Sequence, residues 1–172
     1  MFQTLDEAVS FIRHKSVAMV DLKFCDLWGR WRHVTLPAGR FNPSLIESGM
    51  GFDGSSLGLT AVKSGDLVLV PELGTAFLDP FWEAPTISFL CATLEADTRH
   101  PFPHDPRTLA TRAEEFLRTS GVGDASLWGP EFEFYVFNGV SYENGMNVAA
   151  YRVESQEGDW GSSQMGTGYA MP

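Results

Sequence analysis

The stretch VAMVDLKFCDLWGRWRHVTLP, residues 17–37, predicts how the first part of the chain folds. In its first half Val20, Leu22 and Phe24 are apolar, and the residues between them are charged. Successive side chains of a strand point to opposite faces, so this alternation predicts a strand with one buried face. A turn in the middle leads into a second apolar run over 31–36. Together the two halves predict a β-hairpin.

The sequence around this hairpin predicts one helix and two further strands. Thr4 and Glu7 have the spacing of a capping box, and apolar residues then recur with helical spacing, which predicts a helix over 4–14. The stretches DLVLVPEL, residues 66–73, and TISFLCATLEAD, residues 86–97, are typical of strands. A helix, a hairpin and further strands predict a small α+β domain over about the first hundred residues.

A proline-rich segment, residues 99–106, is typical of a linker and predicts a second region after it. Asp105 as N-cap and Pro106 at the first helical position then predict a helix that ends near Gly121. We expect a strand in SLWGPEFEFYVF, residues 126–137, and no regular periodicity after residue 138. The apolar face of the predicted helix is formed by Leu109, Ala113, Phe116 and Leu117.

Charge and composition exclude some classes of partner. The 172 residues contain 22 acidic and 12 basic side chains, a formal net charge of -10. This argues against binding to nucleic acid or an anionic membrane, since both require clustered Lys and Arg. No apolar run approaches the roughly 20 residues that span a bilayer, and the N-terminus lacks the order of a signal peptide. Cys25 and Cys91 suggest reduced thiols, so we expect a cytoplasmic protein.

The stretch GMGFDGSS, residues 49–56, contains the spacing G-x-G-x-x-G. A dinucleotide-binding loop needs a strand before its glycines and a helix after them. Here a short helix or turn precedes the glycines and no helical face follows, so this interpretation is excluded. What remains is a Gly-flanked loop that presents Asp53, Ser55 and Ser56. It is either a tight turn bonded to its own backbone or a mobile loop that offers a carboxylate to a cationic ligand.

Glu131 and Glu133 alternate with apolar residues in GPEFEFYVF, residues 129–137. In a strand both glutamates lie on one face, and both faces are rich in apolar residues, as in a strand buried on two sides. Buried carboxylates are costly unless a cation compensates them, and oxygen ligands suit Mg²⁺ or Mn²⁺. A solvated sheet edge is the alternative, and the carboxylate pair of a glycosidase is a less favoured one.

The two motifs together resemble a known family. GFDGSS, residues 51–56, and GPEFEF, residues 129–134, are similar to signatures of type I glutamine synthetase, and DLVLVPE, DPFWEAPTISFLCATLEADT and ESQEGDW resemble that family in the same order. The resemblance implies an N-terminal β-grasp domain over 1–100. It also implies that 101–172 begin a catalytic α/β barrel, which we expect to be incomplete.

The resemblance assigns roles to four residues. Glu131 and Glu133 match glutamates that bind paired divalent metals, Mg²⁺ or Mn²⁺, two in each complete site. Asp53 and Ser56 match a loop that reaches the active site of a neighbouring subunit, where the aspartate binds and deprotonates ammonium. The implied enzyme joins glutamate and ammonia, with ATP as co-substrate and γ-glutamyl phosphate as intermediate, and is a dodecamer-like homo-oligomer.

Two features separate this chain from the family pattern. The other metal ligands, the nucleotide-binding residues and the glutamate-binding arginines are expected downstream of Pro172, so we expect no ligase activity from these residues alone. Thr60 and Ala61 stand where many members carry an aromatic residue near the site entrance. A γ-glutamyl ligase for another amine, such as a polyamine, or a non-catalytic relative therefore remain alternatives.

Overall fold

The computed structural model describes residues 2–155 and 158. The chain divides into two compact units, Met1–Ser126 and Leu127–Pro172, and each is described by itself. The helices are α1 Leu5–His14, α2 Pro43–Ser48 and α3 Pro106–Thr119, with short 3-10 turns η1 Ala38–Arg40, η2 Gly54–Leu57, η3 Val62–Ser64 and η4 Leu73–Thr75. The strands are β1 Met19–Cys25, β2 Trp31–Pro37, β3 Met50–Asp53, β4 Asp66–Pro71, β5 Phe77–Asp79, β6 Thr86–Glu95, β7 Gly139–Asn144 and β8 Ala149–Glu154. No helix of these described residues is long and apolar enough to cross a membrane.

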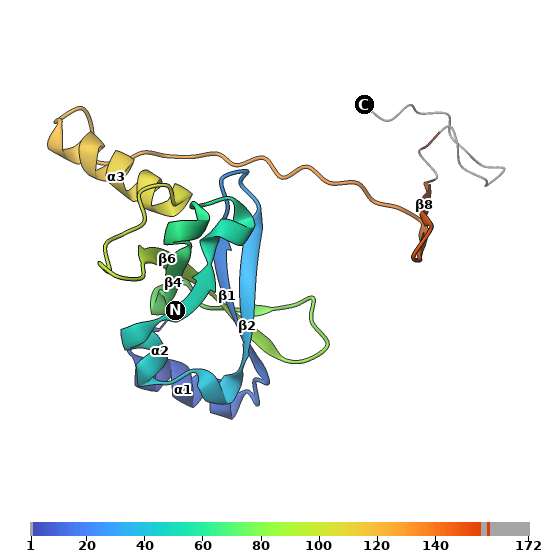
Figure 1. Cartoon of the computed structure of the whole chain (residues 1–172), viewed down its shortest axis with the longest axis horizontal. Helices are drawn as coiled ribbons and strands as arrows, with labels where there is room; N and C mark the ends of the chain where they lie inside the picture. Colours follow the sequence, from blue (N-terminus) through green and yellow to red (C-terminus); the bar gives the residue numbers. More distant parts are fainter. Residues whose placement is uncertain (1, 156–157, 159–172) are drawn as a thin grey trace. The chain divides into compact units, whose positions relative to one another are not determined.

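The first unit is built on a mixed sheet with strand order β2-β1-β6-β4-β3, and β5 pairs with β6 (Figure 1). The predicted hairpin is confirmed, since β1 and β2 pair antiparallel with Val20 opposite Leu36. β1 also pairs in parallel with β6, with Val20 opposite Ile87. The predicted strands at 66–73 and 86–97 are confirmed as β4 and β6.

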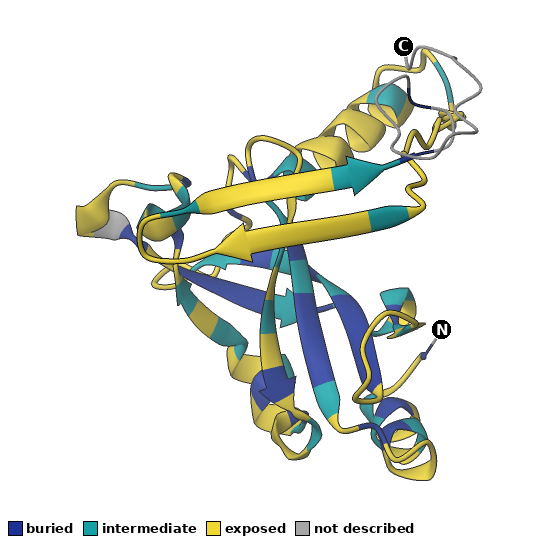
Figure 2. Ribbon diagram, turned by 90° about the vertical axis from the view of Figure 1, so that its right-hand side faces the viewer, coloured by how far each residue is buried: buried dark blue, intermediate teal, exposed yellow. Residues whose placement is uncertain are grey.

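One face of this sheet forms the hydrophobic core together with α1. The predicted capping box is present, because the Thr4 hydroxyl accepts from the amide of Glu7 and the Glu7 carboxylate accepts from the amide of Thr4. Helix α1 buries Ala8 and Ile12 on its sheet-facing side. The buried parts of the central strands are dark blue in Figure 2. At the centre, Phe89 is fully buried and stacks on Phe41 with 4.7 Å between ring centroids.

The turn of the first hairpin is closed by Asp26, which is fully buried. Its Oδ1 accepts hydrogen bonds from the amides of Trp28 and Arg30, and its Oδ2 accepts one from Arg32 Nε at 2.8 Å. Gly29 takes the positive φ of 77° that the turn requires. The turn therefore fixes the register of β1 against β2.

Helix α3 confirms the caps predicted for it, with Pro106 in its first turn and the Asp105 carboxylate accepting from the amide of Thr108. The apolar face predicted for this helix is exposed rather than buried. No residue of α3 is buried, and Leu109 and Phe116 are 60% and 72% exposed. Periodicity predicts which face is apolar, and burial also requires a neighbouring element to cover it.

The strand predicted over 126–137 is wrong. Residues 127–137 belong to no helix or strand and are exposed. Alternating apolar residues indicate what a strand would bury, but a strand forms only where a neighbour completes its hydrogen bonds. No described residue pairs with this segment in a ladder.

The second unit instead forms a hairpin that periodicity did not predict. β7 and β8 pair antiparallel with Tyr142 opposite Tyr151, and the amide of Gly145 donates to the carbonyl of Val148 across the turn. Its strands are rich in small and polar residues, which is why no strand was expected after residue 138.

Candidate functional site

Asp53 lies at the end of β3, where the sheet of the first unit passes into η2. β3 pairs with β4, which places Asp53 opposite Asp66. The amide of Gly54 donates to the carbonyl of Gly65 at 2.7 Å. Asp53 is the N-cap of η2, so its position is fixed by the ladder on one side and by the cap on the other.

The carboxylate of Asp53 accepts several hydrogen bonds from its own loop. Oδ1 accepts from the Ser55 amide at 2.9 Å and from the Ser55 hydroxyl at 2.6 Å, and Oδ2 accepts from the Ser56 hydroxyl at 2.5 Å. The hydroxyls of Ser55 and Ser56 lower the pKa of Asp53 below its ordinary value, so the group is an anion at neutral pH.

The structure therefore shows an ordered turn at Asp53, as the first of the two interpretations of this loop predicts. The side chain is nevertheless exposed. An exposed anion held in a fixed position can cap the turn and also attract a cation. The structure is thus compatible with both roles.

Two glycines of the motif are explained by packing rather than by phosphate binding. Gly49 has a φ of 73°, and a Cβ there would lie 2.3 Å from Val68 Cγ1. A Cβ on Gly54 would lie 2.6 Å from Leu67 Cδ1. Gly49 is required, because its φ is positive and a Cβ would also lie 2.7 Å from the carbonyl oxygen of Leu69. At Gly54 the close atom is the end of the Leu67 side chain, so a larger residue would require that side chain to shift. The glycines are preceded by α2 and followed by a short 3-10 turn, which confirms that this is not a dinucleotide-binding loop.

Glu131 and Glu133 lie in the exposed segment 127–137 of the second unit, outside any helix or strand. Carboxylate oxygens suit Mg²⁺ or Mn²⁺, but Mg²⁺ takes octahedral coordination that two side chains cannot complete. Among the described residues no group of three or more His, Cys, Asp or Glu could hold a metal ion. The two glutamates have the right ligand chemistry, and their role as metal ligands stays a prediction.

A second polar cluster on the outer face of the sheet was not predicted. Asp21 is 1% exposed, and its Oδ1 lies 2.6 Å from His33 Nδ1 and accepts from the Thr35 hydroxyl at 2.6 Å. Lys23 Nζ lies 2.7 Å from Asp79 Oδ2. No sequence pattern indicates a role for His33, although the hairpin register places it directly opposite Lys23. This cluster ties β5 to β1 and β2.

The chain is similar to proteins of known families. Residues 16–96 match the family described as "Glutamine synthetase, beta-Grasp domain". A glutamine synthetase of Aquifex aeolicus is 37% identical over 170 residues, which are 98% of this chain and 36% of that protein. A 3-hydroxylaminophenol mutase of Cupriavidus pinatubonensis is 36% identical over 165 residues, 95% of this chain and 35% of the relative.

The solved structures agree on the fold. The cryo-EM structure of Plasmodium falciparum glutamine synthetase matches with a TM-score of 0.69 at 18% identity, over 98% of this chain and 33% of that one. The chain thus spans about a third of the length of the proteins it matches. The resemblance is confirmed: residues 16–96 match the β-grasp domain of the glutamine synthetases, and nearly the whole chain is similar to proteins of that family.

Proposed function

We propose that this chain is the N-terminal portion of an ATP-dependent glutamate–ammonia ligase, which forms glutamine through γ-glutamyl phosphate. The observation that carries this proposal is Asp53, an exposed anionic carboxylate fixed at the end of β3. It is supported by similarity to glutamine synthetases along nearly the whole chain. We further propose that the protein is cytoplasmic.

Asp53 suits the binding of ammonium because its carboxylate is exposed and anionic at neutral pH. The γ-carboxylate of glutamate is a poor electrophile, so transfer of a phosphoryl group from ATP must precede attack by ammonia. The hydroxyls of Ser55 and Ser56 stabilise the anionic form of Asp53, which keeps a negative charge available for NH₄⁺. The same carboxylate accepts the proton that ammonium loses as ammonia attacks.

Glu131 and Glu133 are proposed to supply two of the oxygen ligands of a paired Mg²⁺ or Mn²⁺ site. Further ligands would come from outside the described residues. When bound, such ions neutralise phosphate charge and hold the reacting groups in line. We also propose that the Asp53 loop serves the active site of a neighbouring subunit in a dodecamer-like homo-oligomer.

The test of the ammonium role is Asp53→Asn in the full-length protein. Asparagine keeps the size and the capping oxygen but removes the charge. We expect an ammonium-dependent loss of kcat/KM of about 100-fold or more, which is the usual contribution of a positioned acid or base. Hydroxylamine is neutral near pH 7 and should partly rescue the variant.

The matched control is Ser55→Ala, which removes one hydrogen bond to Asp53 and leaves the carboxylate in place. It should change kcat/KM far less than Asp53→Asn. If both variants respond alike to ammonium, or if Asp53→Asn keeps the wild-type response, the proposed role of Asp53 is wrong.

Mixed oligomers test the placement across subunits. Subunits with Asp53→Asn and subunits with Glu131→Ala are each expected to be impaired. When they are mixed, some interfaces combine an intact Asp53 with an intact glutamate pair, and activity should return. Verified mixed oligomers without recovery would place Asp53 in the site of its own subunit or outside the site.

A second candidate function differs in the amine. It is motivated by Thr60 and Ala61, which follow the Asp53 loop where many members of the family carry an aromatic residue. The similarity to a protein named 3-hydroxylaminophenol mutase supports some diversity of reaction among the relatives. Steady-state assays with ammonium, hydroxylamine and a polyamine would separate the two. A higher kcat/KM for the polyamine would identify a γ-glutamyl ligase for another amine.

A further inference from the structure

The loop between β5 and β6 presents two exposed aromatic side chains. Phe81 is 92% exposed and Trp82 is 53% exposed, and we call them the aromatic knob. The loop projects from the side of the first unit as the light green hairpin in Figure 1. Its prolines at 80 and 85 restrict the backbone on both sides of the knob.

The base of the knob is held in place by hydrogen bonds. Asp79 Oδ1 accepts from the amide of Phe81 at 3.0 Å, and Asp79 Oδ2 pairs with Lys23 Nζ at 2.7 Å. On the other side, the carbonyl of Pro85 accepts from the amides of Ala18 and Met19. The knob is therefore preorganised, which lowers the entropy that a partner would have to offset on binding.

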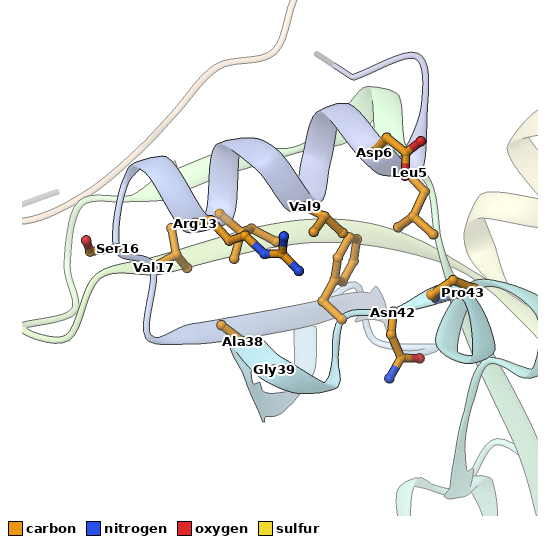
Figure 3. A pocket seen from close by; sticks show the side chains of 12 residues that line it. Leu5, Asp6, Val9, Arg13, Ser16, Val17, Ala38, Gly39, Asn42 and Pro43 are labelled. Carbon is orange, nitrogen blue, oxygen red and sulfur yellow. The ribbon is translucent and has the colours of Figure 1, made fainter.

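A hollow of about 400 Å³ lies between α1 and the segment that contains η1 and the start of α2 (Figure 3). Val9, Ile12 and Phe41 give it apolar walls, and Gly39 lies on the η1 side. Arg13 from α1 extends its guanidinium along the hollow (Figure 3). Asp6 also lines the hollow, near the other end of α1 from Arg13. An aromatic side chain followed by an acidic one would match the apolar wall if the acid lies at the Arg13 end.

The knob of one molecule cannot fill the hollow of the same molecule. Side chains of β1 alternate, so Val20 and Leu22 face the core and α1, whereas Asp21 and Lys23 face the other side. Phe81 and Trp82 lie with Met19 and Thr35 on that outer side. The hollow lies on the α1 side of the same sheet. The knob of a second copy can reach the hollow, because it does not have to cross the sheet.

Charge favours the same pairing. Glu83 follows the knob directly and is exposed, and Arg13 lies at the hollow. Neither makes a salt bridge with another described residue. With a net charge of -10, copies of the chain repel one another on average, so specific association needs a local contact of opposite sign.

We propose that the aromatic knob of one copy inserts into the α1 hollow of a second copy, with Glu83 of the first copy paired to Arg13 of the second. The contact joins two different surfaces, so it is head-to-tail and leaves one knob and one hollow free in each pair. Such contacts build rings or open chains rather than closed dimers. The contact does not depend on the proposed ligase activity and can be tested without it.

The first experiment is sedimentation velocity of the 172-residue chain over a range of concentrations. Phe81→Ala removes the more exposed ring of the knob, and Gly39→Trp fills the hollow at a position where a Cβ meets nothing within 4 Å. Each should weaken self-association by about tenfold or more, as for a residue that dominates an interface. Phe116→Ala, an exposed aromatic on α3, is the matched control and should change nothing.

Mixing the two variants gives a sharper result. The Phe81→Ala chain keeps its hollow and the Gly39→Trp chain keeps its knob, so the mixture should form a 1:1 pair and stop there. Charge reversal provides an independent check, since Arg13→Glu and Glu83→Arg should each weaken association and the double variant should restore it.

Three outcomes would overturn the proposal. The first is a chain that stays monomeric at every concentration. The second is unchanged association of the Phe81→Ala variant. The third is a double charge reversal that associates as weakly as the single variants. Circular dichroism of each variant confirms that its fold is retained.

Discussion

Asp53 and the pair Glu131–Glu133 come from the two motifs that we propose to serve one active site, yet their local structures differ. Asp53 lies at the end of a paired strand, accepts hydrogen bonds from its own loop and caps η2. Glu131 and Glu133 lie in an exposed segment outside any helix or strand. The first motif is structured by residues close to it in sequence, whereas the second needs neighbours to pair with its backbone.

The difference follows from the range of the interactions involved. The hydrogen-bonding partners of the Asp53 cap and of the β3–β4 ladder lie within about fifteen residues of Asp53, because β4 follows η2 and η3 closely along the chain. An extended segment that is apolar on both faces can be stable only inside a sheet with both faces covered. The chain therefore contains an ordered turn at Asp53, the proposed ammonium site, and two proposed metal ligands in a segment without regular structure.

The largest expected effect is on the free energy of unfolding, and it contrasts the core of the first unit with the exposed segment 127–137. Phe89→Ala removes a fully buried ring that stacks on Phe41 and should lower the free energy of unfolding by about 3–5 kcal/mol. Phe134→Ala, at 78% exposure, should change it by no more than about 0.5 kcal/mol. Urea unfolding followed by far-UV circular dichroism measures both. A comparable loss for Phe134→Ala would show that residues 127–137 are packed.

The next effect concerns activity in the full-length protein. Glu131→Ala or Glu133→Ala should reduce kcat/KM by more than about 100-fold. The loss of a metal ligand is expected to lower activity at least as much as the loss of a residue that only hydrogen-bonds to a ligand. The midpoint of urea unfolding should be the same in both variants as in the wild type, because the side chains of Glu131 and Glu133 are exposed. Variants with wild-type turnover and unchanged metal dependence would exclude the metal role.

The contrast also explains which parts of the structure the sequence could predict. The capping box at Thr4, the cap and proline at Asp105–Pro106 and the hairpin over 17–37 were all predicted, because each depends on residues only a few positions apart. The strand over 126–137 was wrong, because alternation describes the side chains and not the availability of a partner strand.

Two other features were missed for different reasons. β3 has only four residues, flanked and interrupted by glycines, so its alternation is too short to detect. The cluster of Asp21, His33 and Asp79 depends on the register of three strands, which no local pattern specifies. For the candidate site, the positions of Asp53 and Ser56 on one turn followed from the sequence, and their hydrogen bonds did not.

A smaller effect is expected at the N-terminus of α3. Asp105 is 3% exposed and caps α3 through the amide of Thr108. Asp105→Ala should lower the free energy of unfolding by about 1 kcal/mol, as for other N-cap deletions. Thermal unfolding of Asp105→Ala beside the conservative Asp105→Asn measures this. An equal loss in both variants would mean that the cap hydrogen bond is not the cause.

The smallest effect is a shift in the titration of Asp53. Its pKa is lowered from the ordinary value of 3.8, so folding gains stability above that pH and loses it as the pH falls through the lower value of the folded state. Ser56→Ala removes one hydrogen bond to Oδ2 and should raise the pKa toward 3.8. Carbon-13 NMR of the carboxyl group follows the titration, and an unchanged pKa would show that the Ser56 hydroxyl does not stabilise the anion.

Amide hydrogen exchange of the 172-residue chain tests most directly whether one motif is preformed and the other is not. The amide of Gly54, bonded to the carbonyl of Gly65 at 2.7 Å, should exchange slowly, together with the amides of β3 and β4. The amides of residues 131–137 should exchange close to the rate of an unfolded peptide, because this segment has no ladder. Protection of 131–137 equal to that of β3, or rapid exchange at Gly54, would contradict the account.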